Sequence, residues 1–178
     1  MLKMFSTQLT GVFKKLMDEE SFSFEDSARL LAQAAIGDGT IYIHGTGEMK
    51  GILAEAFDGP EIFPHAKPYD TASGSPALTI EDRVLIFTRY ANDPEALSLA
   101  KTLREQHIPT AAVSSIIADD EQSLEKVTDV HVDLRLKKGL LPDETGGRYG
   151  YPSLMAALFA YYGIKFTLEE ILQEYEEE

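Results

Sequence analysis

Two short stretches of the chain contain residues whose types and spacing suit the binding of a small anion. The first is a glycine-rich corner at residues 45–48, which follows a β-branched run at 40–44 and precedes apolar residues at helical spacing. A strand that enters a helix through glycines brings backbone N–H groups and the positive end of the helix dipole to one place. We therefore expect an anionic ligand at this corner, where the ligand-binding candidates are Gly45, Thr46 and Gly47.

The second stretch follows residues 83–88, whose nearly continuous hydrophobicity is typical of a central strand covered on both faces. Asp93 is predicted to be the N-cap of a helix that begins at Pro94. Because ligands of parallel sheets bind beyond the carboxyl ends of the strands, residues after neighbouring strands are candidates too. The remaining ligand-binding candidates are Thr88, Arg89, Asn92, Ser114, Ser115 and, from a late loop, Arg148.

Each of these positions also has a purely structural interpretation. Gly45 and Gly47 can serve the tight corner alone, and Asp93 can serve the helix cap alone. His44, at the end of a strand, is either an acid/base group or a hydrogen-bonded structural histidine. Glu48 either stabilises the first turn of a helix or acts as a general base. Both interpretations stay open at this point.

The elements that must position these residues alternate between strand and helix after two leading helices. The predicted helices lie at residues 2–17, 23–37, 49–58, 94–107, 119–126, 152–162 and from 167 onward, and the predicted strands at 40–44, 61–63, 83–88, 110–113 and 129–134. Residues 64–76 and 136–150 are predicted to contain little regular structure. This alternation predicts an α/β fold, a three-layer αβα sandwich around a mainly parallel five-stranded sheet.

Composition limits the classes of partner. The formal charge of −14 disfavours nucleic acid and anionic membrane surfaces, and no apolar run is long enough to span a bilayer. The absence of cysteine excludes disulfides and thiolate sites, and the four histidines lack metal-ligand spacing. We expect a cytoplasmic protein with no cofactor and no metal. The glycines at 45, 47 and 51 match a dinucleotide fingerprint only weakly, because no clear carboxylate follows for a ribose.

The order of these motifs resembles the SIS (sugar isomerase) domain over about residues 1–165. Its first corner typically reads Gly-x-Gly-x-Ser, and the chain has Gly45-Thr46-Gly47-Glu48-Met49. Its second corner typically reads Ser-x-Ser-Gly-x-Ser/Thr-Pro/x-Glu, and the chain has Thr88-Arg89-Tyr90-Ala91-Asn92-Asp93-Pro94-Glu95. The whole chain also resembles an uncharacterised Firmicutes family that is grouped with this superfamily.

The resemblance implies binding of a phosphorylated sugar or a related anionic carbohydrate, with phosphoheptose-type aldose–ketose isomerisation as the implied reaction. It implies Glu48 or Glu55 as the catalytic base. Two features depart from the family pattern: Tyr90 and Asp93 stand where hydroxyls usually bind phosphate, and no histidine follows His131. The alternative is therefore a non-catalytic regulatory or ligand-binding module with a degenerate phosphate site.

We expect one domain over residues 1–178, with leading helices over 1–37 and an acidic helix or tail over 166–178. The first and last helices have longer apolar stripes than one small sheet needs. Exposed apolar surface of that kind is typical of interfaces, so a homodimer or larger homo-oligomer is also predicted.

Overall fold

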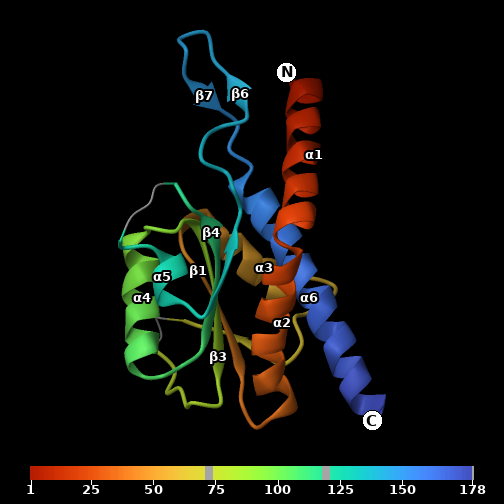
Figure 1. Ribbon diagram of the computed structural model, residues 1–178, viewed down its shortest axis with the longest axis vertical. Helices are drawn as coiled ribbons and strands as arrows, with labels where there is room; N and C mark the ends of the chain where they lie inside the picture. The colour runs from red at the N-terminus through yellow and green to blue at the C-terminus, as the bar shows by residue number, and fades with distance from the viewer. Residues whose placement is uncertain (71–73, 118–120, 178) are drawn as a thin grey trace.

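The computed structural model describes residues 1–70, 74–117 and 121–177 and contains a five-stranded sheet in the order β2-β1-β3-β4-β5 (Figure 1). Every neighbouring pair of these strands is parallel. The strands are β1 Ile41–Gly45, β2 Ala66–Pro68, β3 Arg83–Tyr90, β4 Thr110–Ser115 and β5 Val130–Asp133. The predicted α/β sandwich with a mainly parallel sheet is confirmed.

Helices cover both faces of the sheet, because successive strand residues point to opposite sides. Ile43, Leu85 and Phe87 pack with one group of helices, and Val84 and Ile86 pack with the other. The first group comprises α1 Leu2–Glu19, α2 Ser21–Ile36, α3 Gly51–Asp58 and α6 Ser153–Glu177, and the second comprises α4 Pro94–Glu105 and α5 Leu124–Val127. In Figure 1, α4 and α5 lie on one side of the sheet, and α2 and α6 lie on the other. No helix in the described ranges is long and apolar enough to cross a bilayer.

The strand order places the two predicted corners at one location. The chain leaves β1 through α3 toward β2 on one side, and it leaves β3 through α4 toward β4 on the other. The carboxyl ends of β1 and β3, which are neighbours, therefore flank the point where the direction of winding reverses. In open α/β sheets this switch point forms the crevice in which ligands bind.

Several element boundaries differ from the sequence predictions. The edge strand lies at Ala66–Pro68 instead of residues 61–63, within a segment predicted to be irregular. Pro68 is tolerated there because an edge strand has one side without a neighbour that needs its N–H. The predicted loop at 136–150 contains a small antiparallel hairpin, β6 Leu141–Pro142 with β7 Arg148–Tyr149. This hairpin projects beyond the carboxyl edge of the sheet (Figure 1).

The helices also differ in detail. The helix after the first corner opens with a 3₁₀ turn, η1 Gly47–Lys50. The second helix begins at Ser21, without the side-chain cap predicted at Ser23. Of the helix predicted at 119–126, α5 covers Leu124–Val127, and residues 119 and 120 lie outside the described ranges.

The last two predicted helices form a single helix, α6. Gly163 lies inside it, where an added Cβ would be 3.0 Å from the ring of Phe24 on α2. The glycine thus allows α6 to cross α2 closely and does not end the helix. Thr167 donates a hydrogen bond to the carbonyl of Gly163 at 2.9 Å, within the helix, and does not cap a new one.

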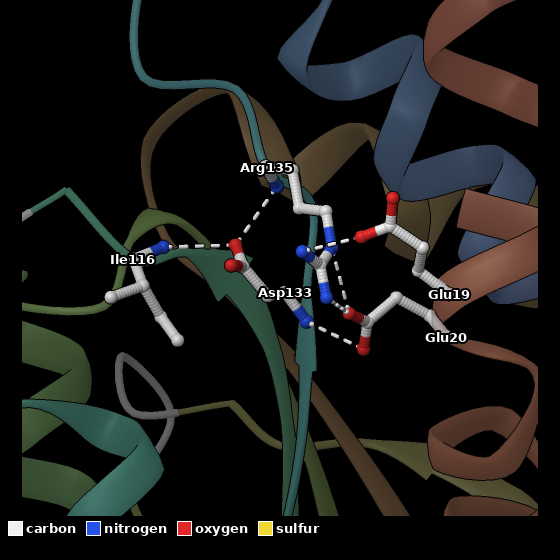
Figure 2. Close-up of polar contacts among 5 residues, drawn as sticks. All are labelled: Glu19, Glu20, Ile116, Asp133 and Arg135. Carbon is white, nitrogen blue, oxygen red and sulfur yellow. Dashed lines mark hydrogen bonds and ion pairs between the residues drawn. The ribbon is translucent and has the colours of Figure 1, made fainter. Parts of the chain in front are cut away.

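A buried ion-pair cluster joins the carboxyl end of β5 to the junction of α1 and α2 (Figure 2). Arg135 pairs with Glu19 at 2.7 Å and with Glu20 at 2.6 Å, and Glu20 is only 4% exposed. The backbone N–H of Asp133 donates to the second oxygen of Glu20 at 3.2 Å. The carboxylate of Asp133 in turn accepts from the backbone N–H groups of Ile116 and Arg135. This cluster fixes the chain where it leaves the sheet for the β6–β7 hairpin.

Candidate functional site

The two corners at the switch point line one pocket of about 520 Å³. This volume lies within the usual range for small-molecule sites. Its lining residues are Thr46, Gly47, Glu48, Thr88, Arg89, Tyr90, Asn92, Asp93, Pro94 and Glu95. Six residues predicted to bind ligand or to act in catalysis therefore lie together: Thr46, Gly47, Glu48, Thr88, Arg89 and Asn92.

A hydrogen bond between two threonine hydroxyls joins the corners. The Oγ1 atoms of Thr46 and Thr88 are 2.7 Å apart, and both residues are buried. The backbone N–H of Thr46 donates to the carbonyl of Phe87 at 3.0 Å, which extends the contact between β1 and β3. Two hydroxyls in one hydrogen bond have one further hydrogen to donate. The pair is thus both a structural clamp and a hydrogen-bond donor beside the pocket.

The two glycines of the first corner are required for different reasons. A Cβ at residue 45 would lie 2.6 Å from the carbonyl oxygen of Met49, so Gly45 permits the backbone of the corner to turn back on itself. Gly47 has φ of +53° and open space around its Cα. Its requirement is conformational, since a left-handed backbone disfavours other residues. Gly45 does not line the pocket, whereas Gly47 does.

The charged side chains of the pocket are mostly acidic. Arg89 donates from Nε to Glu48 Oε1 at 2.5 Å, and both side chains are partly exposed. The hydrogen bond to Glu48 is the largest cause that raises the pKa of Arg89. Asp93 caps α4 as predicted, accepting from the backbone N–H of Ala96 at 2.9 Å. With Glu95, three carboxylates line the pocket against one guanidinium.

His44 lies beside the pocket, on the face of the sheet that α4 covers. It is 5% exposed, and its Nδ1 is 3.3 Å from the carbonyl oxygen of Tyr69. Its Nε2 is 3.7 Å from Glu95 Oε1. His44 and Glu95 both line a second groove that adjoins the pocket, so Glu95 is shared between the two.

Two of the other candidates are held in contacts away from the pocket. Glu55 lies on α3 and accepts a hydrogen bond from the Tyr162 hydroxyl at 2.5 Å, a contact that raises the pKa of Tyr162. Arg148 donates to the backbone carbonyls of Gly139 and Leu140 at the base of the β6–β7 hairpin. Neither side chain reaches the two corners.

The two serines at the end of β4 are buried rather than lining the pocket. Ser114 Oγ is 2.7 Å from His131 Nε2, and burial lowers the pKa of His131 to about 4. Ser115 Oγ accepts from the backbone N–H of Leu136 at 3.2 Å. Both hydroxyls thus fasten β4 to β5 and to the chain that follows it.

Sequence reasoning did not assign Tyr90 and Glu95 to the ligand site, yet both line the pocket. The signal for Glu95 was its position in the first turn of the helix that starts at Pro94, directly beyond the second corner. Among the described residues, no group of three or more histidine, aspartate or glutamate side chains is placed to hold a metal ion.

Comparison with protein families gives a match over most of the chain. A family described as a domain of unknown function (DUF2529) matches residues 1–172. A protein from Bacillus subtilis (strain 168), uncharacterized protein YwjG, is 46% identical over 175 residues, which cover 98% of this chain and 99% of that protein.

Solved structures with the same fold include proteins described by their sugar phosphates. An Escherichia coli CFT073 protein in complex with arabinose 5-phosphate has a TM-score of 0.66 at 16% identity, covering 97% of this chain and 89% of its own. A Methanococcus jannaschii protein, whose structure was taken to infer a 3-hexulose-6-phosphate isomerase, has a TM-score of 0.62 at 14% identity, covering 98% and 90%. The Vibrio vulnificus NanR protein complexed with ManNAc-6P has a TM-score of 0.63 at 14% identity, covering 99% and 64%. At these identities the similarity shows the fold alone, which is that of phosphosugar isomerase domains.

Proposed function

Because the chain belongs to the DUF2529 family and has the fold of phosphosugar isomerase domains, we propose that it binds a phosphorylated sugar or a related anionic carbohydrate. The ligand's place is the pocket between the β1 and β3 corners. One observation carries the proposal: the predicted corners meet at the switch point, where the two threonine hydroxyls and Arg89 offer donors to an anion. The sugar phosphates bound by the Escherichia coli and Vibrio proteins support the ligand class.

Phosphate binding at this site requires Arg89 to exchange partners. In the free protein Arg89 is paired with Glu48, and the two side chains are 43% and 37% exposed. An exposed pair of this kind contributes about 0–1 kcal/mol. A phosphate accepts two parallel hydrogen bonds from a guanidinium and has more negative charge than a carboxylate. The exchange is therefore favourable, and it leaves the Glu48 carboxylate free to accept from a sugar hydroxyl.

The acidic lining limits the affinity for phosphate. A carboxylate about 4 Å from a phosphate charge costs about 1 kcal/mol in a water-like environment and about 4 kcal/mol at a partly buried surface. Asp93 is held at the pocket by its cap hydrogen bond to Ala96. We therefore expect weak binding of the phosphate, with the sugar hydroxyls supplying further affinity through the remaining acceptors.

Isomerisation is the reaction that such a ligand would undergo if the protein is an enzyme. It needs a base that moves a proton between neighbouring carbons, and Glu48 is the predicted base that lines the pocket. Glu55, the other predicted base, is bound to Tyr162 on the far side of α3. If the protein turns over sugar phosphates, Glu48 is the residue whose substitution should abolish turnover.

A non-catalytic ligand-binding module is the second candidate function. The observation that favours it is the pocket lining, which combines three carboxylates with one arginine and has no histidine. In this case ligand binding should stabilise the protein without any turnover of the sugar phosphate.

We also propose that the protein is a homodimer. The first helix extends beyond the sheet (Figure 1), and its apolar residues Leu2 and Met4 are 81% and 46% exposed. Light scattering coupled to size exclusion measures the mass, and a mass of one chain would contradict the proposal.

Isothermal titration with a panel of sugar phosphates, alongside a coupled assay for aldose–ketose conversion, tests the ligand class. Arg89→Gln should weaken binding about tenfold, because it removes the one cation of the pocket. Arg29→Gln is the matched control, since Arg29 forms a similar exposed pair with Glu25 on α2, away from the corners. Equal affinities of wild type and Arg89→Gln would contradict the proposed site, and no binding of any sugar phosphate would contradict the ligand class.

A further inference from the structure

The groove that adjoins the pocket is lined by polar side chains from three separate segments. They are His44 from β1, Tyr69 after β2, and Glu95, Ser98 and Thr102 from successive turns of α4. The groove and the pocket share Glu95, so one bound molecule can extend from one into the other.

The hydrogen bonds of His44 define which ring nitrogen carries a proton in the neutral side chain. Nδ1 is 3.3 Å from the carbonyl oxygen of Tyr69, which can only accept. Nδ1 is therefore assigned the hydrogen, and Nε2 has a lone pair. The edge-to-face contact between the rings of His44 and Tyr69, with centroids 5.7 Å apart, holds the imidazole in this orientation.

The lone pair of Nε2 faces another acceptor. Nε2 is buried and has no hydrogen-bond partner among the described residues. Glu95 Oε1 lies 3.7 Å away, and the Glu95 side chain is 60% exposed. Two acceptors at this separation need donors from a third group, and buried polar atoms in folded proteins are nearly always paired. Because Glu95 is exposed, a change of its rotamer gives a ligand access to Nε2.

We infer that this groove is a sugar subsite, in which neighbouring hydroxyls of the ligand donate to His44 Nε2 and to the Glu95 carboxylate. The inference rests on the proposed function, which places the phosphate in the adjoining pocket near Arg89. The ligand class that fits both sites is a phosphosugar with a vicinal diol. His44 is then a binding residue that recognises a hydroxyl, and Glu95 connects the diol subsite to the phosphate pocket.

Binding of sugar phosphates is compared with binding of methyl phosphate, which has the phosphate monoester but no sugar hydroxyls. The probes are ribose 5-phosphate, glucose 6-phosphate and fructose 6-phosphate, and the measurement is isothermal titration. Wild type should bind at least one of them more tightly than methyl phosphate. In His44→Asn and in Glu95→Gln this preference should fall about tenfold, while methyl phosphate binds as in wild type or slightly more tightly.

The variants separate the subsite from the fold and from the phosphate pocket. His44→Asn retains a donor for the Tyr69 carbonyl, and Glu95→Gln changes an exposed side chain, so the second variant keeps the test valid if the first fails to fold. Glu105→Gln, at the other end of α4, is the matched control and should leave all affinities unchanged.

The outcomes distinguish this inference from the proposed function. If the preference for sugar phosphates persists in both variants, or if wild type shows no preference, the subsite is refuted and the phosphate pocket stands. In that case His44 and Glu95 form only a structural contact. If wild type binds neither methyl phosphate nor any of the sugar phosphates, the proposed function fails, and the subsite fails with it.

Discussion

Replacing Arg135 should destabilise the fold far more than replacing an exposed arginine. Arg135 donates from Nε and Nη2 to Glu20 Oε1 at 3.0 and 2.6 Å (Figure 2). In Arg135→Gln the buried carboxylate of Glu20 keeps the backbone N–H of Asp133 as its remaining hydrogen-bond donor. Glu20 is also the N-cap residue of α2, where the helix dipole favours a negative charge.

The size of the effect follows from the exposure of each partner. Breaking a fully buried ion pair costs about 3–5 kcal/mol. The Arg135 side chain is 33% exposed and that of Glu20 is 5% exposed, so water partly replaces the lost arginine. Together with the helix dipole, which contributes about 0.3–1 kcal/mol, this lowers our expectation to about 2 kcal/mol.

Urea unfolding followed by circular dichroism measures this loss. With a slope of about 2 kcal/mol/M, the midpoint should fall by about 1 M. Arg29→Gln is the control, because its pair with Glu25 has side chains 64% and 45% exposed and should contribute less than about 0.5 kcal/mol. The double variant Glu20→Gln/Arg135→Gln should be more stable than the sum of the single effects predicts, because no buried charge is left unpaired. The reasoning is refuted if Arg135→Gln is no less stable than Arg29→Gln, or if the two single effects add.

Three further predictions concern the corners and β5. Gly45→Ala should destabilise the fold by about 2 kcal/mol or more, since its Cβ would lie 2.6 Å from a backbone oxygen, whereas Gly11→Ala, with open space on a helix, should stabilise by about 0.5–1 kcal/mol; equal midpoints in urea would contradict this. Asp93→Ser retains a capping side chain and removes a charge, so calorimetry should show sugar-phosphate affinity about fivefold higher, and lower affinity would contradict the proposed place of the phosphate. The pKa of His131 is lowered to about 4, below its value of about 6.5 in the unfolded chain, so the folded state binds that proton less readily. Neutral His131 therefore contributes stability above pH 6.5 that is lost as the pH falls toward 4, by about 3 kcal/mol at most. Its ring resonances should titrate near pH 4, and a midpoint near 6.5 would refute the buried environment.

The strands and corners were predictable because their signals are local. A hydrophobic run that ends in Gly45 or Thr88 identifies a buried strand, and Asp93 followed by Pro94 identifies a helix start. Since parallel strands bring their carboxyl ends to one edge, the sequence also predicted that the two corners lie close together. The 520 Å³ pocket agrees with that geometry.

The contacts inside the pocket were not predictable because they join residues distant in sequence. Glu48 and Arg89 are 41 residues apart, and their ion pair depends on the register of β1 against β3. Ser114 was correctly placed near the carboxyl edge of the sheet. Whether its hydroxyl faces a pocket or a neighbouring strand is decided by His131 on β5, 17 residues away.

The errors in the helices have a related cause. Gly163 carries the same local signal as a helix terminus, but the ring of Phe24 selects glycine there for close packing. Tertiary contact thus overrides the local preference, and the two predicted helices become one. The β6–β7 hairpin was missed because each of its strands has only two residues, too few for a periodic pattern.

The central claim is that a sugar phosphate binds between the β1 and β3 corners and takes Arg89 from Glu48. Amide and arginine Nε resonances of the 19.7 kDa protein, followed by NMR during titration with fructose 6-phosphate, test it most directly. A basic groove beside α1, which includes Lys137, Lys138 and Arg148, is the competing place for an anion. The claim predicts shifts at Gly47, Thr88 and the Nε of Arg89, with the basic groove unchanged. Shifts confined to the basic groove, with Arg89 unchanged, would contradict it.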